Sequence, residues 1–183
     1  MARIRFRIPT LGKRGNSGSA AVEFAMIAPA FFLMFFASFE TGMTYFASMA
    51  LENGLIETSR LIRTGQAQAQ NMTQTQFRDA LCGQINMLLS CDADQLYIDV
   101  RAFNNFGGSS YQDALDENGD LNPNLNTYQP GQSSATTGTP NIVLVRVFYK
   151  WKLYTPLFAE YYANLAGDYR LLTTSVAFRN EPF

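Results

Sequence analysis

The sequence predicts an α+β protein: a long N-terminal helix, transmembrane in its first part and amphipathic in its second, followed by a small domain with a three-stranded antiparallel sheet. Two patterns predict this class. Helical spacing of apolar residues extends from about Ser19 to Thr64, where Gly65 is a typical stop signal. Three later stretches alternate with a period of two and have little helical pattern between them, which favours antiparallel pairing.

The first part of this helix is apolar over a membrane-spanning length. Residues 24–39 contain no charged side chain, and residues 20–22 extend the run toward the N-terminus past Glu23. The resulting twenty residues, Ala20 to Phe39, would cover about 30 Å as a helix, which is the hydrocarbon thickness of a bilayer. Pro29 lies inside the run and would kink the helix there, a feature that membrane helices tolerate.

The charge distribution predicts an orientation. Five cations and no acid precede the run, and the next cation is Arg60. The five are Arg3, Arg5, Arg7, Lys13 and Arg14. The positive-inside rule therefore places residues 1–18 in the cytoplasm and the bulk of the chain outside it. Two alternatives remain for the run: a buried helix of a soluble protein, or a secretory signal peptide cut after Ser48-Met49-Ala50.

The residues at the start of the run carry the most specific pattern. A short basic leader ends in Gly18, small residues follow, and Glu23 and Phe24 stand five and six positions after that glycine. This pattern resembles the class III signal of the type IV pilin superfamily, and more closely the TadE/TadF-like pseudopilins of the tight-adherence (Flp) pilus system. The resemblance is best over residues 15–60 and less diagnostic over residues 141–183.

The resemblance implies a pilin-like fold and a processing site. A prepilin peptidase would cut between Gly18 and Ser19, so that Ser19 becomes the first residue of the mature chain and Glu23 the fifth. A carboxylate in an apolar helix is unfavourable in lipid until it finds a partner. The α-amine of a neighbouring subunit would supply that partner, although Glu23 could instead reach the headgroups by itself.

The function implied is structural rather than enzymatic. The chain would be a minor pilin (pseudopilin) of an Flp-type pilus, with a cytoplasmic leader 1–18, a helix 19–64 and a periplasmic domain 65–183. It would be a single-pass inner-membrane protein that joins the pilus after assembly. Its expected partners are the membrane, a prepilin peptidase, and other pilin subunits that contact the N-terminal helix. The alternative is a membrane-anchored periplasmic binding or scaffold protein that is not processed.

The domain is expected to contain a second helix and a disulfide. Beyond the membrane, the second part of the long helix would pack on the domain. After a Gln-rich linker at residues 66–74, Thr73 and Gln76 would form the capping box of a helix whose apolar stripe extends to Leu89. Cys82 and Cys91 would form a disulfide in an oxidising compartment. This requires the helix to end near Met87, because a straight helix would keep the two thiols apart.

The remaining segments are strands, a short helix and a polar insertion. The expected strands are residues 96–103, 142–151 and 171–178, and a short helix would extend from Pro156 to Leu165 after Thr155 as N-cap. Residues 107–140 form a flexible polar insertion. Within it, Asp116, Asn118 and Asp120 have the spacing of the first ligands of a calcium loop, but Gly119 and Thr127 do not fit the later positions, and a solvated turn is the alternative.

Composition excludes several classes of function. The chain has no His and two Cys, which excludes imidazole catalysis and an all-thiolate zinc site. After Gly18 it has nine cations and fifteen acids, so no basic surface is expected to bind nucleic acid. The neighbouring acids Asp92/Asp94 and Asp116/Glu117 lie in turn-like stretches, where nothing brings them together across a cleft. We therefore expect no catalytic residue, cofactor, metal or small-molecule substrate.

Overall fold

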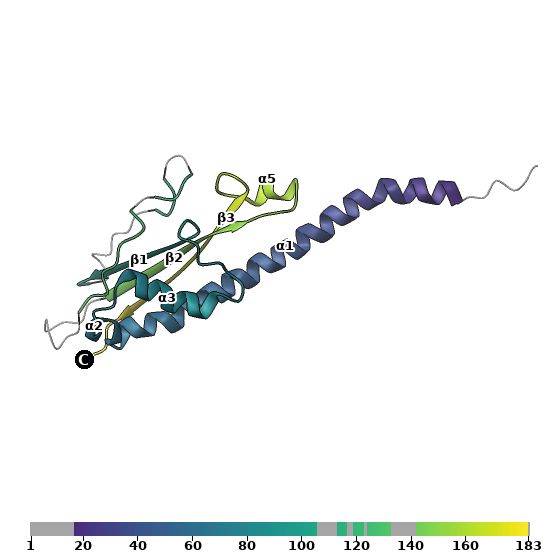
Figure 1. The fold of residues 1–183 in the computed structure, drawn as a ribbon. Helices are drawn as coiled ribbons and strands as arrows, with labels where there is room; N and C mark the ends of the chain where they lie inside the picture. Colours follow the sequence, from purple (N-terminus) through teal and green to yellow (C-terminus); the bar gives the residue numbers. More distant parts are fainter. Residues whose placement is uncertain (1–16, 106–112, 117–118, 123, 133–141, 183) are drawn as a thin grey trace, which may run out of the picture.

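The computed structural model describes residues 17–105, 113–116, 119–122, 124–132 and 142–182 of the 183-residue chain. A long helix, α1, extends well beyond a small domain that is built on its C-terminal half (Figure 1). The domain contains the short helix α2, the helix α3, three strands and the short helix α5, in the order α1-α2-α3-β1-β2-α5-β3. This arrangement confirms the α+β class with a long N-terminal helix.

Helix α1 spans Ser17–Arg63 without interruption. It begins two residues before the predicted start and ends one residue before the predicted end. Pro29 lies inside it. Gly65 follows with a φ of 80°, the left-handed conformation that ends a helix, and its N–H bonds the carbonyl of Ile62 at 3.1 Å. The C-terminal end of α1 is also tied to the chain end, because the N–H of Glu181 donates to the carbonyl of Arg63.

The sheet has three antiparallel strands in the order β1-β2-β3, as predicted from the alternating stretches. Strand β1 is Leu96–Phe103, β2 is Ile142–Lys152 and β3 is Tyr169–Arg179. The central strand pairs with both neighbours over its length, with Ile98 opposite Val147 and Val147 opposite Thr174. The expected strand boundaries are therefore correct for β1 and within two residues for β2 and β3.

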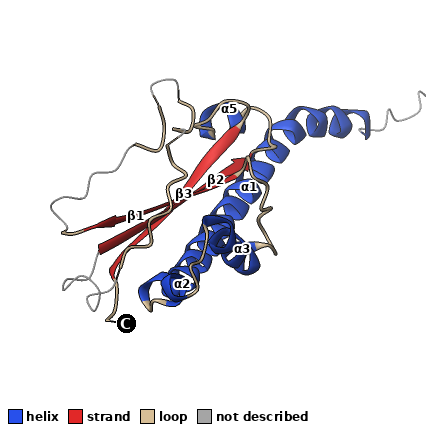
Figure 2. Cartoon of the chain, turned by 60° about the vertical axis from the view of Figure 1, so that its left-hand side comes forward, coloured by secondary structure: helices blue, strands red, loops and turns tan. Residues whose placement is uncertain are grey.

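One face of the sheet packs on α1 and α3, and this contact forms the hydrophobic core. The β-branched and aliphatic residues of β1 and β2 that point to this face are almost fully buried. These strand residues pack against the buried apolar faces of α1 and α3. The buried residues are Ala47, Leu51, Leu55 and Ile62 of α1, and Phe77, Leu81 and Ile85 of α3. Figure 2 shows α1 and α3 together on one side of the strands. The second half of α1 is thus a core element, which explains its length.

The region between α1 and β1 contains the predicted capping box and disulfide. The Gln-rich stretch begins with α2, Gln66–Ala69, whose Ala67 is buried. Helix α3 is Gln74–Ile85, with the reciprocal bonds between Thr73 and Gln76 that were predicted. Because α3 ends at Ile85 and not at Leu89, the chain can turn back, and Cys82 and Cys91 form a disulfide with a Cα–Cα distance of 6.0 Å.

The described parts of the insertion pack on the domain. Residues 127–129 run beside β1, where the N–H of Val100 donates to the carbonyl of Thr127 and the N–H of Gln129 donates to the carbonyl of Val100. This pairing covers part of the β1 edge of the sheet. Leu125 is fully buried, and the Tyr128 ring contacts Phe77 at 5.7 Å between centroids.

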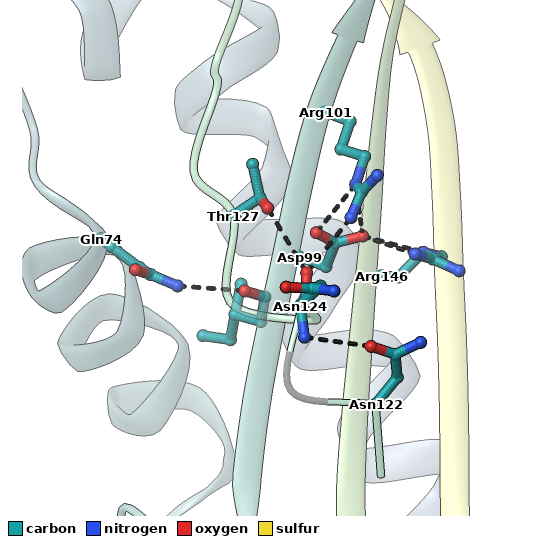
Figure 3. Close-up of polar contacts among 8 residues, drawn as sticks. Gln74, Asp99, Arg101, Asn122, Asn124, Thr127 and Arg146 are labelled. Carbon is teal, nitrogen blue, oxygen red and sulfur yellow. Dashed lines mark hydrogen bonds and ion pairs between the residues drawn. The ribbon is translucent and has the colours of Figure 1, made fainter. Parts of the chain in front are cut away.

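A buried ion cluster lies on the other face of the sheet, beneath this segment (Figure 3). Asp99 is fully buried and accepts from the guanidinium of Arg146, directly opposite on β2, at 2.6 Å. The Nε of Arg101 donates to both oxygens of Asp99, and its Nη2 donates to the carbonyl of Asn124. The cluster therefore joins two strands and the insertion.

Candidate functional site

The predicted processing and assembly residues lie in the first turns of α1. Gly18 has no other atom within 4 Å of where a Cβ would stand, so this position is sterically open. One turn separates Ser19 from Glu23, and the hydroxyl of Ser19 donates to Oε1 of Glu23 at 2.9 Å. Phe24, the next residue, is exposed. The helix thus brings Ser19 and Glu23 together and leaves the whole group accessible to another molecule.

Glu23 has no cation near it among the residues that the structure describes. The first basic residue of the described part of α1 is Arg60. At a rise of about 1.5 Å per residue, Arg60 is on the order of 55 Å away along the helix axis. Ser19 supplies a neutral hydrogen bond, and no described residue places a cation beside the Glu23 carboxylate.

The surface that surrounds Glu23 is apolar. Helix α1 is long and apolar enough to cross a membrane, and the most apolar window of the helix is not buried against the domain. Phenylalanine side chains stack along this half, Phe31 on Phe35 and Phe32 on Phe36, with centroids 6.5 and 6.2 Å apart. An apolar surface of this extent is not left in water by folded proteins and indicates contact with lipid or with other helices.

Exposed apolar residues also continue past the membrane-spanning length. Tyr45, Phe46, Met49 and Ile56 all point away from the domain on the second half of α1. Phe39, Phe46, Met49 and Ile56 follow the 3.5-residue spacing of a helix–helix seam. The outward face of α1 can therefore pack against another helix over most of its length.

Glu40 is a residue with a structural contact that the sequence reasoning missed. It directly follows the apolar run, its exposed fraction is 8%, and its carboxylate accepts from the backbone N–H groups of Tyr154 and, at 3.0 Å, of Thr155. These bonds attach the segment between β2 and β3 to α1. The only sequence signal was a carboxylate at the end of an apolar run.

That segment contains α5, Phe158–Tyr162. The predicted helix after Thr155 thus exists but is shorter than expected, since it starts two residues later and ends three residues earlier. Thr155 directs its N–H to Glu40, and Leu157, which precedes α5, has a φ of 62° that is incompatible with a helix. The Thr155 side chain accordingly does not cap α5, which has no side-chain cap.

The acidic residues considered in the sequence do not form a centre in the described chain. Within the described ranges, no three His, Cys, Asp or Glu side chains gather where they could hold a metal ion. Oδ1 of Asp116 accepts from the N–H of Asp120 at 2.9 Å, which is a turn contact. Glu117 and Asn118 lie outside the described residues, so the expected solvated turn, in place of a calcium loop, stays a prediction.

Comparison with known proteins gives one match. A family model described as TadE-like protein matches residues 18–60. No curated protein and no solved structure matches the chain. The matched segment contains Gly18, Ser19, Glu23 and Phe24, as well as Glu40 and most of the second half of α1. The chain therefore has a TadE-like N-terminal region at residues 18–60, as its leader and glutamate pattern predicted.

Proposed function

We propose that the protein is a minor pilin (pseudopilin) of an Flp-type tight-adherence pilus. In this proposal a prepilin peptidase cuts after Gly18, and α1 anchors the precursor in the inner membrane with the leader in the cytoplasm and the domain in the periplasm. The TadE-like region supports the pilus system, because it covers the segment that contains the processing and assembly residues. The role is structural and requires no cofactor.

The observation that carries the proposal is that Glu23, on an exposed apolar helix, has no cation beside it in the described part of the chain. A carboxylate near the end of a membrane span is unfavourable unless it gains a partner. A cut after Gly18 creates a cationic α-amine at Ser19, one turn from Glu23 on the same helix. In a row of subunits, the amine of one helix can neutralise Glu23 of the next, and this contact fixes how far the helices are shifted along their axes.

The outward face of α1 supports the same mode of assembly. Tyr45, Phe46, Met49 and Ile56 are exposed beyond the apolar run, where lipid does not cover them. Packing against the helices of other subunits would bury this stripe and the apolar run together. A membrane anchor alone would not require apolar residues at these positions.

The processing step is tested by mass spectrometry of the full-length protein, coexpressed with a prepilin peptidase and recovered from membranes. The proposal expects an N-terminus at Ser19. An intact leader would favour the unprocessed membrane-anchored scaffold. A terminus near Leu51 would instead indicate cleavage by signal peptidase.

The assembly step is tested by Glu23→Ala. The variant should insert into membranes, as measured by resistance to carbonate extraction, and should fail to enter sheared pilus fractions. Asp79→Ala, which removes one exposed carboxylate from α3, is the matched control and should assemble normally. Normal assembly of Glu23→Ala would contradict the proposed pairing with the α-amine.

A further inference from the structure

The segment between β2 and β3 is fixed at a defined position along the axis of α1. Glu40 binds the backbone of Tyr154 and Thr155, and Glu40 is the residue after Phe39, the last of the apolar run. If the twenty residues up to Phe39 span the ~30 Å hydrocarbon layer, this segment lies at the membrane boundary on the domain's side. This step rests on the proposed anchoring. Figure 1 shows α5 at the end of the domain that faces the N-terminal half of α1.

The side chains that this segment exposes are apolar or amphipathic. Tyr154 is 81% exposed, Leu157 62% and Tyr161 86%. Leu157 has φ 62° and ψ −39°, a conformation that non-glycine residues rarely adopt. Strained backbone persists where the surroundings impose it, and it often accompanies a functional contact. The Leu157 side chain is mostly exposed, so little of it packs inside the domain.

A groove of about 520 Å³ lies between this segment and the span. Its lining is almost entirely apolar and comes from both sides: Leu33, Phe36, Phe39, Glu40 and Met43 of α1, and Trp151, Tyr154, Thr155 and Pro156. The one carboxylate in this lining, that of Glu40, already accepts hydrogen bonds from two backbone N–H groups. Because Leu33, Phe36 and Phe39 belong to the apolar run, the groove is continuous with the surface that lipid would cover.

The charges near the segment do not form a basic patch. Lys152 lies 3.6 Å from Asp168, and the Arg170 guanidinium stacks on the Tyr162 ring at 3.9 Å. Glu160 is the acid of α5. Tyr and Trp are enriched where hydrocarbon meets headgroups, because their rings have an apolar body and a polar end. The surface therefore fits an apolar contact with lipid and not an electrostatic one.

We propose that residues 153–168 form a second membrane contact, in which Tyr154, Leu157 and Tyr161 enter the headgroup layer and the groove holds an acyl chain of a phospholipid from that leaflet. The continuity of the groove with the apolar run favours a lipid chain over a helix of a second copy, because the same acyl layer would cover both surfaces. Two attachments, α1 and this segment, would fix how the domain is oriented on the membrane.

Trp151 makes the proposal measurable, because it is the single tryptophan of the chain and lines the groove. The full-length protein is reconstituted in phosphatidylcholine vesicles whose acyl chains are brominated either near the glycerol or near the methyl end. The proposal expects Trp151 emission to fall in both and more with the shallow label, and iodide in the aqueous phase to quench little. The combined change Leu157→Asn and Tyr161→Ser should reduce the lipid quenching. Met87→Gln, which changes an exposed residue outside this segment, should leave it unchanged.

A second probe separates this proposal from the membrane anchor. Phe32→Trp in a Trp151→Phe background places the fluorophore in the middle of the apolar run. If the tryptophan at position 32 is quenched by deep bromine and Trp151 is quenched by neither lipid, the anchor stands and the second contact is wrong. If neither position is quenched, the anchor itself is wrong. Protection of Trp151 from both bromine and iodide would show that protein fills the groove, which overturns the lipid assignment in favour of a second copy.

Discussion

Glu40→Ala should release the segment between β2 and β3 from α1. The carboxylate accepts two backbone hydrogen bonds, from Tyr154 and Thr155, and it is 8% exposed. A hydrogen bond to a charged group contributes about 1.5–3 kcal/mol, so the two bonds together contribute at most ~6 kcal/mol. Because the Tyr154 side of the segment is open and water can replace one bond, we expect a loss of about 2–4 kcal/mol.

This loss applies to local opening of the segment and leaves the rest of the domain folded. The core under the sheet does not include Glu40, so the domain should stay folded, and the free energy of global unfolding should fall by no more than this amount. Amide hydrogen exchange resolved by residue is the appropriate assay. The amides of Tyr154 and Thr155 should exchange about 30- to 1,000-fold faster, which is 2–4 kcal/mol expressed as a rate ratio.

Glu52→Ala is the matched control for Glu40→Ala. Glu52 lies on the same helix and is exposed, so its removal tests the effect of losing a glutamate from α1 without losing the two bonds. Its exchange pattern should equal that of the parent protein. Unchanged exchange at Tyr154 and Thr155 in Glu40→Ala would refute the role of the carboxylate in holding the segment.

Four further substitutions test the domain in urea unfolding of the full chain in detergent. Gly54→Ala places a Cβ 2.5 Å from Ile85 Cγ2 and should lower the free energy of unfolding by about 1–3 kcal/mol. In the control Gly42→Ala the new Cβ meets no atom within 4 Å, so this variant should be neutral or gain up to ~1 kcal/mol. Equal urea midpoints for the two variants would contradict the steric argument. Asp99→Asn leaves two guanidinium groups without their counter-charge and should cost about 3–5 kcal/mol, and a parental midpoint would show the cluster to be dispensable. Burial raises the pKa of Tyr128 from 10.0 to about 12, so the folded state holds the phenolic proton more tightly than the unfolded chain does. The free energy of unfolding should therefore fall as the pH rises from 10 to 12, and Tyr128→Phe should remove the part of this fall that Tyr128 causes. The same dependence of stability on pH in both proteins would refute the argument.

The elements with a regular period were predictable. Alternation located the three strands, and helical spacing with a glycine stop located α1 to within two residues. The capping box of α3 was found because it depends on two residues three apart, Thr73 and Gln76. In each case the information is local, so a single sequence contains it.

The features that were missed depend on partners far along the chain. Glu40 bonds backbone N–H groups more than a hundred residues away, and a backbone donor leaves no residue-specific trace in the sequence. Asp99 reads as a solvent-facing position of a half-buried strand. It is buried because the insertion, a polar stretch without periodicity, folds over that face through Leu125 and Asn124.

The family pattern predicted processing and assembly residues but not how the helix is fixed to its domain. Gly18, Ser19, Glu23 and Phe24 stand on one exposed turn and a half of α1, and what they bind is a proposal. Nothing in that pattern concerns Glu40. The Leu157 conformation was equally unforeseen, since a leucine after Thr155-Pro156 reads as part of a helix.

Glu23 and Glu40 are the same residue type at the two ends of one apolar run, in opposite situations. Glu40 is buried, and its carboxylate bonds two N–H groups of its own chain, so it fixes the helix to the domain. Glu23 is exposed and has one neutral hydrogen bond and no described cation beside it. If the proposed function holds, Glu23 is free to fix the helix to a neighbour. Because Glu40 sets the helix–domain geometry within each subunit, the pairing at Glu23, roughly 25 Å away along the axis, would then set the position of the whole domain in the assembly.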